Sequence, residues 1–455
     1  MATLEFTALG GGSEIGANSY LLAAEGHSIL LDCGLHPKKE GVDALPDFSR
    51  LNDVPEAVIV SHGHIDHCGA VPYLVKRFPS IECYATPPTV QIMDRMLHNS
   101  VSVMGTLALE QGIEGYPLYS HSDVDLTIRR TYGLDLGREF ALTWDSPFTA
   151  SFHHAGHVLG SASILLQVEG HTVFYTGDVC MGDQELMGGL TLPADGVHVD
   201  TLIVESTRGA HVDVGHATYS REVERLAAEV ASVLERGGTV LVPSFALGRT
   251  QELLNIIARL IESGRLPDVP VYASGLGRAI YEVYGKWGEY LRPDATLRPL
   301  SDFARIGDVW ERGVRRELLR KPCIIVATSG MMVENTPSAM IAMDVVRHTH
   351  HAIFFVGYLD PDTPGYRLLH AEPGERVVLE SSAPPVEVLL ENRQSFNLSA
   401  HATREQLGEL IARIEPTNVV FVHGDADAVA WMRSHCNGRY RGFAPLSGET
   451  LALEA

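Results

Sequence analysis

Short runs of apolar residues recur along the chain, and each ends near a glycine, an acidic residue or a serine. The runs are SILLDCG (28–34), AVIVSHGH (57–64), TVFYTGD (172–178), LIVEST (202–207), TVLVPS (239–244), CIIVATSG (323–330), AIFFVGY (352–358) and NVVFVHGD (418–425). Apolar runs without polar alternation are typical of strands that are buried on both faces of a sheet. The pattern therefore predicts buried strands at these places.

Helical periodicity appears between some of these runs. Residues 221–236 place Val223, Leu226, Ala227, Val230 and Leu234 on one face, and two glycines follow at 237 and 238. This spacing predicts a helix that ends at the glycine pair. Because strands and helices alternate, we expect an α/β protein.

The ends of the predicted strands differ along the chain. Those in the first 180 residues end in histidines and aspartates, whereas those between 240 and 360 end in residues such as Ser244, Thr328 and Ser329. The chain has 455 residues, which is too long for one ordinary core. No repeat or long Pro/Ser linker separates the parts, so we expect a second domain that is inserted into the first.

Composition narrows the class of protein. No apolar run reaches the roughly 18 residues of a membrane span, and the first residues lack the features of a signal peptide, so we expect a cytoplasmic protein without a membrane partner. The six cysteines show no CxxC spacing, which favours reduced thiols. A net charge of -22 disfavours a general nucleic-acid coat, but it allows a local basic groove or a metal-lined cleft.

The stretch SHGHIDHCGA (61–70) concentrates side chains that bind metals. It contains His62, His64, Asp66 and His67 directly after an apolar strand. Imidazole and carboxylate groups are the ligands that zinc prefers in hydrolytic sites. His62 and His64 can face one metal from an extended loop, and Asp66 and His67 can face a second metal after a turn.

Two metals need more ligands than this loop supplies. His157 lies in HHAGHVLGSAS and Asp178 in FYTGDV, beside small residues that allow close approach. The two oxygens of an aspartate can bridge two cations, and we expect this of Asp178. Asp32 ends another strand and is expected to orient a ligand imidazole, although a simple turn aspartate is the alternative.

The order HxHxDH, with an earlier aspartate, a later histidine and a later aspartate, resembles the metallo-β-lactamase superfamily. The motifs LIVESTRG, VPSFALGRTQELL, VATSGMM, FFVGY and SAHA follow in the order of its β-CASP nuclease branch. This branch includes the pre-mRNA 3′-end endonuclease and ribonuclease J. The resemblance covers nearly the full chain. It implies an α/β fold, a metallo-β-lactamase αββα sandwich with an inserted α/β β-CASP domain. The expected boundaries are 1–208 and 373–455 for the sandwich and 209–372 for the insertion.

The resemblance also implies roles for individual residues. It assigns two Zn²⁺ ions to the chain. One zinc would be held by His62, His64 and His157, the other by Asp66, His67 and His401, with Asp178 bridging and Asp32 orienting the ligands. Glu205 would support a ligand histidine or proton transfer. From the residues alone, TREQ (403–406) is a capping box, which places His401 on the loop before a helix.

Several positions depart from the pattern. Arg208 stands where relatives have an aromatic residue, and His370 is the nearest candidate for a histidine that the branch has after its GY motif. His423 in FVHGD resembles a late family motif, but core packing explains it equally well. Arg249, with the arginines of the run 311–321, is a candidate basic wall, against a solvent-facing helix as the favoured alternative for that run.

The leading hypothesis is a zinc-dependent ribonuclease that cuts single-stranded RNA, internally or from the 5′ end, with a two-metal-activated hydroxide. One alternative is a hydrolase of a small ester, lactone or phosphodiester on the same metal core. Another alternative is a non-catalytic RNA-processing scaffold. Because homodimers occur among relatives, a second copy of the chain is a further expected partner.

Overall fold

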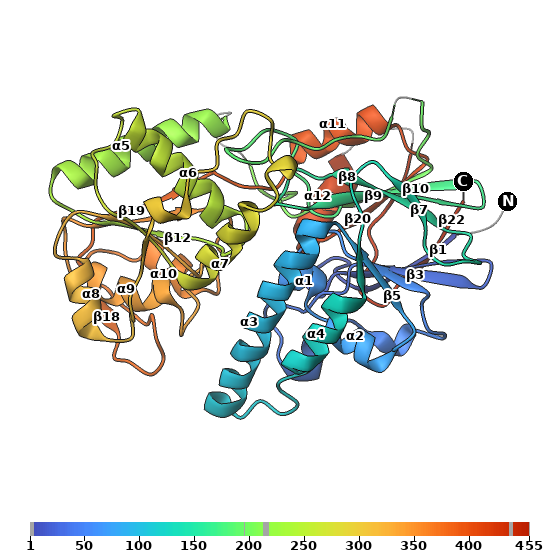
Figure 1. Ribbon diagram of the computed structural model, residues 1–455, viewed down its shortest axis with the longest axis horizontal. Helices are drawn as coiled ribbons and strands as arrows, with labels where there is room; N and C mark the ends of the chain where they lie inside the picture. The colour runs from blue at the N-terminus through green and yellow to red at the C-terminus, as the bar shows by residue number, and fades with distance from the viewer. Residues whose placement is uncertain (1–3, 195, 213–217, 436–439, 455) are drawn as a thin grey trace. The chain divides into compact units, whose positions relative to one another are not determined.

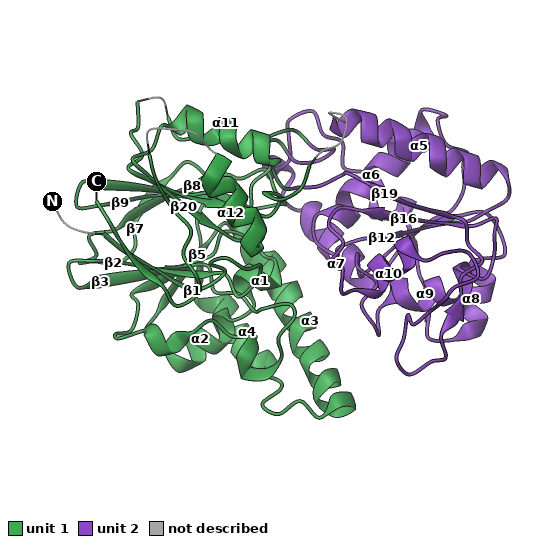
Figure 2. Cartoon of the chain, turned by 180° about the vertical axis from the view of Figure 1, so that it is seen from behind, with its two compact units in different colours: residues 1–183, 188–212, 401–455 green, residues 184–187, 213–400 purple. Residues whose placement is uncertain are grey.

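The protein is described by a computed structural model that covers residues 4–194, 196–212, 218–435 and 440–454 (Figure 1). The chain forms two compact units (Figure 2). The first unit contains residues 1–183, 188–212 and 401–455, and the second contains residues 184–187 and 213–400. We expected the chain to return to the first domain at residue 373. It stays in the second unit up to residue 400, because β19 (Asn392–Phe396) pairs in parallel with β16 (Ala352–Val356) of that unit's sheet.

The first unit is built on two seven-stranded sheets. In spatial order, the first sheet contains β22 (Thr450–Leu453), β1 (Leu4–Gly10), β2 (Ser19–Ala24), β3 (His27–Leu31), β4 (Ala57–Ile59), β5 (Glu82–Ala85) and β6 (Thr131–Gly133). The second sheet contains β21 (Arg441–Phe443), β20 (Asn418–Val422), β11 (Thr201–Glu205), β10 (His171–Tyr175), β9 (Ala162–Val168), β8 (Thr149–His154) and β7 (Glu139–Ala141).

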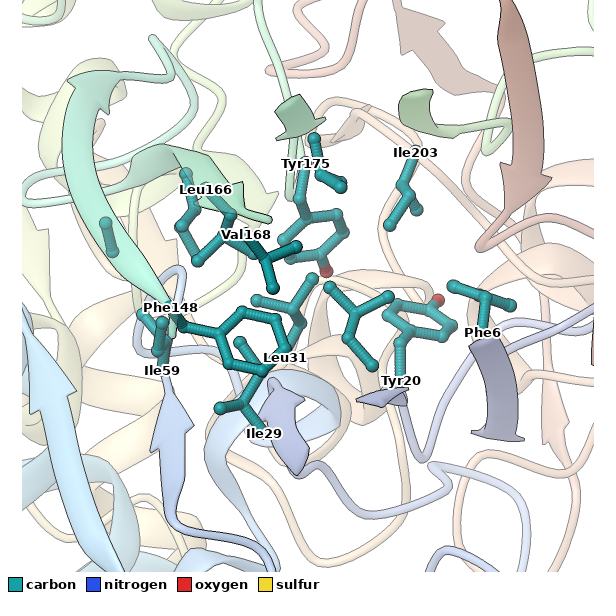
Figure 3. Close-up of a cluster of buried hydrophobic side chains, with 14 of the residues drawn as sticks. Phe6, Tyr20, Ile29, Leu31, Ile59, Phe148, Leu166, Val168, Tyr175 and Ile203 are labelled. Atoms are coloured by element: carbon teal, nitrogen blue, oxygen red, sulfur yellow. The ribbon is translucent and has the colours of Figure 1, made fainter. Parts of the chain in front are cut away.

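A hydrophobic core joins the two sheets (Figure 3). Tyr20 from β2 and Tyr175 from β10 meet edge to face, with ring centroids 5.7 Å apart. Two further apolar clusters lie on the outer faces. The helices that cover the first sheet are α1 (Ile65–Cys68), α2 (Val71–Arg77), α3 (Pro87–Gln111) and α4 (His121–Arg130), and those that cover the second are α11 (Arg404–Ile414) and α12 (Ala426–His435). The first unit is therefore a four-layer αββα sandwich.

The second unit has an open parallel sheet with helices on both faces. Its strands, in spatial order, are β14 (Ala304–Arg305), β13 (Val271–Ala273), β15 (Ile324–Ala327), β12 (Val240–Pro243), β16 and β19. Its helices are α5 (Tyr219–Glu235), α6 (Arg249–Glu262), α7 (Gly275–Tyr284), α8 (Arg312–Leu318), α9 (Pro337–Val345) and α10 (Pro364–His370). A small ribbon of β17 (Arg376–Val377) and β18 (Val386–Glu387) is separate.

Residues 184–187 are held in the second unit by buried polar contacts. The carboxylate of Glu252 on α6 accepts hydrogen bonds from the main-chain N–H groups of Glu185, Leu186 and Met187, at 2.6 to 3.2 Å. Arg249 contacts Gln184 and donates to the Leu398 carbonyl at 2.7 Å. These bonds satisfy main-chain N–H groups within residues 184–187, a segment whose sequence neighbours belong to the other unit.

The expected basic wall is partly used for internal contacts. Arg249 is buried in the contacts just described, and Arg315 is buried in an ion pair with Asp344 at 2.6 Å. Arg312, Arg316 and Arg320 are exposed on or just after α8. A buried arginine that pairs within its own domain serves the fold, so neither Arg249 nor Arg315 forms a surface for a ligand.

Each of the eight apolar runs overlaps a strand, and the helix predicted for 221–236 is α5, whose apolar face is buried. These predictions are confirmed. The long helix α3 and the antiparallel strands β1, β2, β8 and β9 had no counterpart in the sequence prediction. Across the described residues, no helix is both long enough and apolar enough to cross a membrane.

Candidate metal centre

Ends of buried strands deliver most of the candidate ligands to one place in the first unit. His62 and His64 follow β4, Asp178 follows β10, and His423 follows β20. Asp66 and His67 lie on the single turn of α1. His157 lies on the loop after β8, where Gly156 has a φ of 78° and a Cβ atom would come within 2.4 Å of the Cys180 carbonyl oxygen. Only glycine lets this loop lie so close to the segment after Asp178.

The first cluster consists of His62, His64, His157 and Asp178, with one ligand atom of each within 4.8 Å of the others. Nδ1 of His64 lies 3.0 Å from Nε2 of His62 and 3.2 Å from Nε2 of His157. Oδ2 of Asp178 lies 3.5 Å from Nε2 of His62 and 3.6 Å from Nε2 of His157. These four side chains thus converge on a common point.

The second cluster consists of Asp66, His67 and His423. Oδ2 of Asp66 lies 3.3 Å from Nε2 of His423 and 3.7 Å from Nε2 of His67. Oδ1 of Asp178 is 3.3 Å from Nε2 of His67 and 3.4 Å from Nδ1 of His423. Asp178 therefore faces the first cluster with one oxygen and the second cluster with the other.

The donor set fits a pair of divalent metal ions. Nδ1 of His64 faces the Nε2 atoms of His62 and His157 at 3.0 and 3.2 Å, so these three nitrogens cannot all be donors, and a cation among them would satisfy their lone pairs. Oδ1 of Asp178 is buried and makes no regular hydrogen bond within the described residues. Such an orphaned carboxylate oxygen, next to two imidazoles, is the arrangement expected of a bridging ligand.

Asp32 fixes the orientation of two of these histidines. Its Oδ2 lies 2.8 Å from Nδ1 of His67 and accepts hydrogen bonds from the Ser61 hydroxyl at 2.7 Å and the Tyr175 hydroxyl at 2.6 Å. The Ser61 hydroxyl is in turn 3.0 Å from Nδ1 of His62. Because the Nδ1 atoms are engaged in this way, the Nε2 atoms of both rings point toward the clusters.

Burial and neighbouring charges set the protonation of the ligands. Burial lowers the pKa of His62 well below its ordinary value, and the nearby His67 lowers it further. Burial would also lower the pKa of His67, but Asp178, Asp66 and Asp32 outweigh it and raise that pKa well above the ordinary range. Burial opposes ionisation of Asp178, yet His423 and His67 hold the pKa of this carboxyl well below its usual range. The carboxylate is therefore ionised, as a metal ligand must be.

His401 lies beside the centre but pairs with Glu205. Its Nδ1 is 3.1 Å from both carboxylate oxygens of Glu205, the last residue of β11. Its ring centroid is 4.6 Å from that of His157. Burial lowers the pKa of His401, but the Glu205 carboxylate outweighs this and the net pKa is raised. Arg208 donates from Nη1 to the His401 carbonyl oxygen at 3.4 Å, so the segment 205–208 contacts both the ring and the main chain.

The geometry differs from the sequence expectation at one position. Among the described residues, the groups able to hold a metal include His423 where we expected His401. The capping box of Thr403 and Gln406 is present, so His401 does precede a helix as predicted. His370 belongs to the second unit, where it is exposed and its Nδ1 lies 2.9 Å from the Tyr366 carbonyl oxygen.

Comparisons with known protein families match three parts of the chain. The Metallo-beta-lactamase superfamily model matches residues 12–218 and the Beta-Casp domain model matches residues 250–368. A third model, the Zn-dependent metallo-hydrolase RNA specificity domain, matches residues 385–445. The first match lies mainly in the first unit, the second lies in the second unit, and the third extends from the end of the second unit into the last part of the first unit.

Individual relatives agree with these matches. The chain is 31% identical to the RNase J-like protein of Methanocaldococcus jannaschii, over 91% of this chain and 91% of that protein. It is also 31% identical to the cleavage and polyadenylation specificity factor subunit 3 of Dictyostelium discoideum, over 99% of this chain but only 57% of that longer protein. A crystal structure of a protein of unknown function from Enterococcus faecalis V583 superposes with a TM-score of 0.62 over 100% of both chains, at 15% identity, which supports the fold alone.

Proposed function

Because the chain belongs to the β-CASP branch of the metallo-β-lactamase superfamily, we propose that it is a zinc-dependent ribonuclease that hydrolyses phosphodiester bonds of single-stranded RNA. Family membership confirms the predicted resemblance and the α/β sandwich with an inserted domain. The match to an RNA specificity domain at residues 385–445 supports RNA as the substrate, as does the name of the RNase J-like relative.

One observation carries the proposal for the site: the two oxygens of Asp178 face two separate clusters of imidazole and carboxylate groups. The first cluster would hold one zinc ion and the second cluster the other, with Asp178 shared between them. Zinc ions bound there would supply a nucleophilic water at neutral pH and neutralise the charge that grows on the phosphate oxygens. Two metals close together suit the in-line displacement of a phosphodiester.

The remaining polar residues orient groups and handle protons. Asp32 holds the Nδ1 atom of His67 directly and that of His62 through Ser61. Glu205 holds Nδ1 of His401, so we assign Nε2 of His401 to proton transfer to the leaving oxygen of the scissile bond. This assignment replaces the role of metal ligand that the sequence led us to expect for His401.

The test is cleavage of a 5′-labelled single-stranded RNA by protein whose zinc content has been measured. The Asp66→Ala variant removes a candidate ligand, and Asp53→Ala, an exposed carboxylate on a loop of the same unit, is the matched control. We expect the unsubstituted protein and the Asp53 variant to degrade the RNA and the Asp66 variant to leave it intact. The ladder of labelled products distinguishes internal cutting from cutting at the 5′ end.

A different result would redirect the proposal. If the protein binds two zinc ions per chain and the RNA survives, the ribonuclease function is wrong. In that case small esters, lactones and phosphodiesters become the substrates to test. If the unsubstituted protein and both variants bind the RNA and none of the three cuts it, the scaffold alternative holds.

A further inference from the structure

Asn18 is a fully buried polar residue that lies against the second cluster. It comes at the end of the loop GGGSEIGAN and directly precedes β2. Its main-chain N–H donates to the Asp66 carbonyl oxygen at 3.0 Å, and its side-chain Nδ2 donates to the same oxygen at 2.9 Å. The same Nδ2 lies 3.1 Å from Nε2 of His67 and 3.5 Å from Oδ2 of Asp66. The amide therefore touches ligand atoms of two members of the cluster.

The orientation of this amide is fixed by its partners. A carbonyl oxygen can only accept, so the Asn18 atom that faces the Asp66 carbonyl must be the nitrogen. The opposite end agrees, because Oδ1 of Asn18 accepts a hydrogen bond from the Tyr20 hydroxyl at 3.2 Å. Nδ2 has a second hydrogen beyond the one donated to the carbonyl, and that hydrogen faces the side with Asp66 Oδ2 and His67 Nε2.

The same loop contacts the third member of the cluster through Gly11. The Gly11 carbonyl oxygen accepts the main-chain N–H of His423 at 2.8 Å and the Tyr20 hydroxyl at 2.9 Å. A Cβ atom at residue 11 would lie 2.1 Å from Oδ1 of Asn18. Gly11, Asn18 and Tyr20 thus form one hydrogen-bonded frame that reaches Asp66, His67 and His423.

We propose that Asn18 is a positioning residue for the second metal ion. Its amide raises the zinc affinity of the second cluster and leaves the zinc affinity of the first cluster unchanged. This inference rests on the proposed two-metal function. When His67 Nε2 gives its lone pair to a metal, the amide of Asn18 is left to donate to Asp66. The amide thereby holds the Asp66 carboxylate in the position in which this carboxylate binds the metal. Groups that orient metal ligands in this way contribute about 10- to 100-fold to metal affinity.

The test compares the zinc affinity of three full-length proteins by equilibrium dialysis against buffered Zn²⁺, with metal and protein measured in the same sample. Asn18→Ala removes the amide. Asn418→Ala is the matched control, since Asn418 is equally buried in the same unit and donates from its amide to the Glu454 carbonyl oxygen and Thr201 hydroxyl. The unsubstituted protein should bind two equivalents. Asn18→Ala should keep one tight equivalent and bind the other about 10- to 100-fold more weakly, whereas Asn418→Ala should bind both as the unsubstituted protein does.

Tyr20→Phe is a second variant in case Asn18→Ala does not fold, because it removes only a hydroxyl, whose single hydrogen is shared between Oδ1 of Asn18 and the Gly11 carbonyl oxygen. It should weaken the same equivalent by a smaller factor. Two tight equivalents in a folded Asn18→Ala, or equal weakening of both equivalents, would overturn the inference. So would fewer than two equivalents in the unsubstituted protein. Failure to cut RNA, with two equivalents bound and one lost on substitution, would overturn the proposed function and leave this inference intact.

Discussion

Nδ1 of His401 lies 3.1 Å from both carboxylate oxygens of Glu205. The carboxylate is itself fixed, because its Oε1 accepts the main-chain N–H of Val179 at 2.7 Å, one residue after Asp178. A histidine held through Nδ1 by a buried carboxylate keeps one tautomer and one ring orientation. The pair therefore has the arrangement of a proton donor beside the metal centre.

From this relationship we predict that His401→Ala slows RNA cleavage and leaves the metal content unchanged. General acid catalysis contributes about 10²- to 10⁴-fold, so kcat should fall by that order while two zinc ions per chain remain bound. Single-turnover rates and zinc analysis of the same preparation check both parts. Loss of a zinc ion from this variant would instead restore the sequence-based assignment of His401 as a ligand.

His423→Ala should have the complementary effect. Its ring completes the second cluster, with Nε2 3.3 Å from Asp66 and Nδ1 3.4 Å from Asp178. We expect the variant to bind about one zinc ion per chain instead of two. His171→Ala is the control, since His171 is also a buried histidine of the same sheet and bonds to Thr201. Equal zinc content in both variants would argue against His423 as a ligand.

The fold and the loop that carries four of the candidate ligands could be predicted because their signals are local. Strands buried on both faces appear as continuous apolar runs, and His62, His64, Asp66 and His67 lie within six residues of one another. The antiparallel strand β8, TASFHH, was missed because it alternates in burial and carries few apolar residues. The contacts of Asn18 depend on a pairing of distant segments, which no local pattern records.

The structure brings His423 into the second cluster, and the sequence carried a signal for this position. It directly follows a buried strand, as Asp32 and the loop with His62 do, whereas His401 precedes a helix. In the structure, Asp32 and His423 also share a positive φ, at 58° and 49°. Residues other than glycine adopt this region rarely, and such positions concentrate at functional sites. A preference for residues that directly follow buried strands would have favoured His423 over His401 as a ligand.

We next predict that Glu252→Gln destabilises the protein. The carboxylate of Glu252 accepts three main-chain N–H groups from residues 185–187, and a glutamine offers one acceptor oxygen and a competing donor group. Each main-chain N–H left unpaired and buried costs about 1–3 kcal/mol, so the thermal midpoint should fall by several degrees. Glu235→Gln, at an exposed position of α5, should leave the midpoint unchanged. A similar midpoint in both variants would contradict the prediction.

Stability should also decrease as the pH falls, through His351. Its ring is buried and its Nδ1 accepts the main-chain N–H of Thr239 at 3.0 Å. Burial, with the nearby His350 and His348, lowers the pKa of His351 from 6.5 to about 4. The unfolded chain therefore takes up this proton first, so the contribution of His351 to stability is present above about pH 6.5 and is lost as the pH falls toward 4.

His351→Asn tests this origin of the pH dependence. Its side-chain oxygen can accept the Thr239 N–H but does not titrate, so thermal midpoints measured between pH 7 and pH 4.5 should fall less than those of the unsubstituted protein. His350→Asn changes an exposed neighbour and should keep most of the original slope. Identical slopes in the unsubstituted protein and His351→Asn would show that other groups cause the loss. A flattened slope only in His351→Asn would identify the buried, neutral imidazole as the group whose protonation opposes folding.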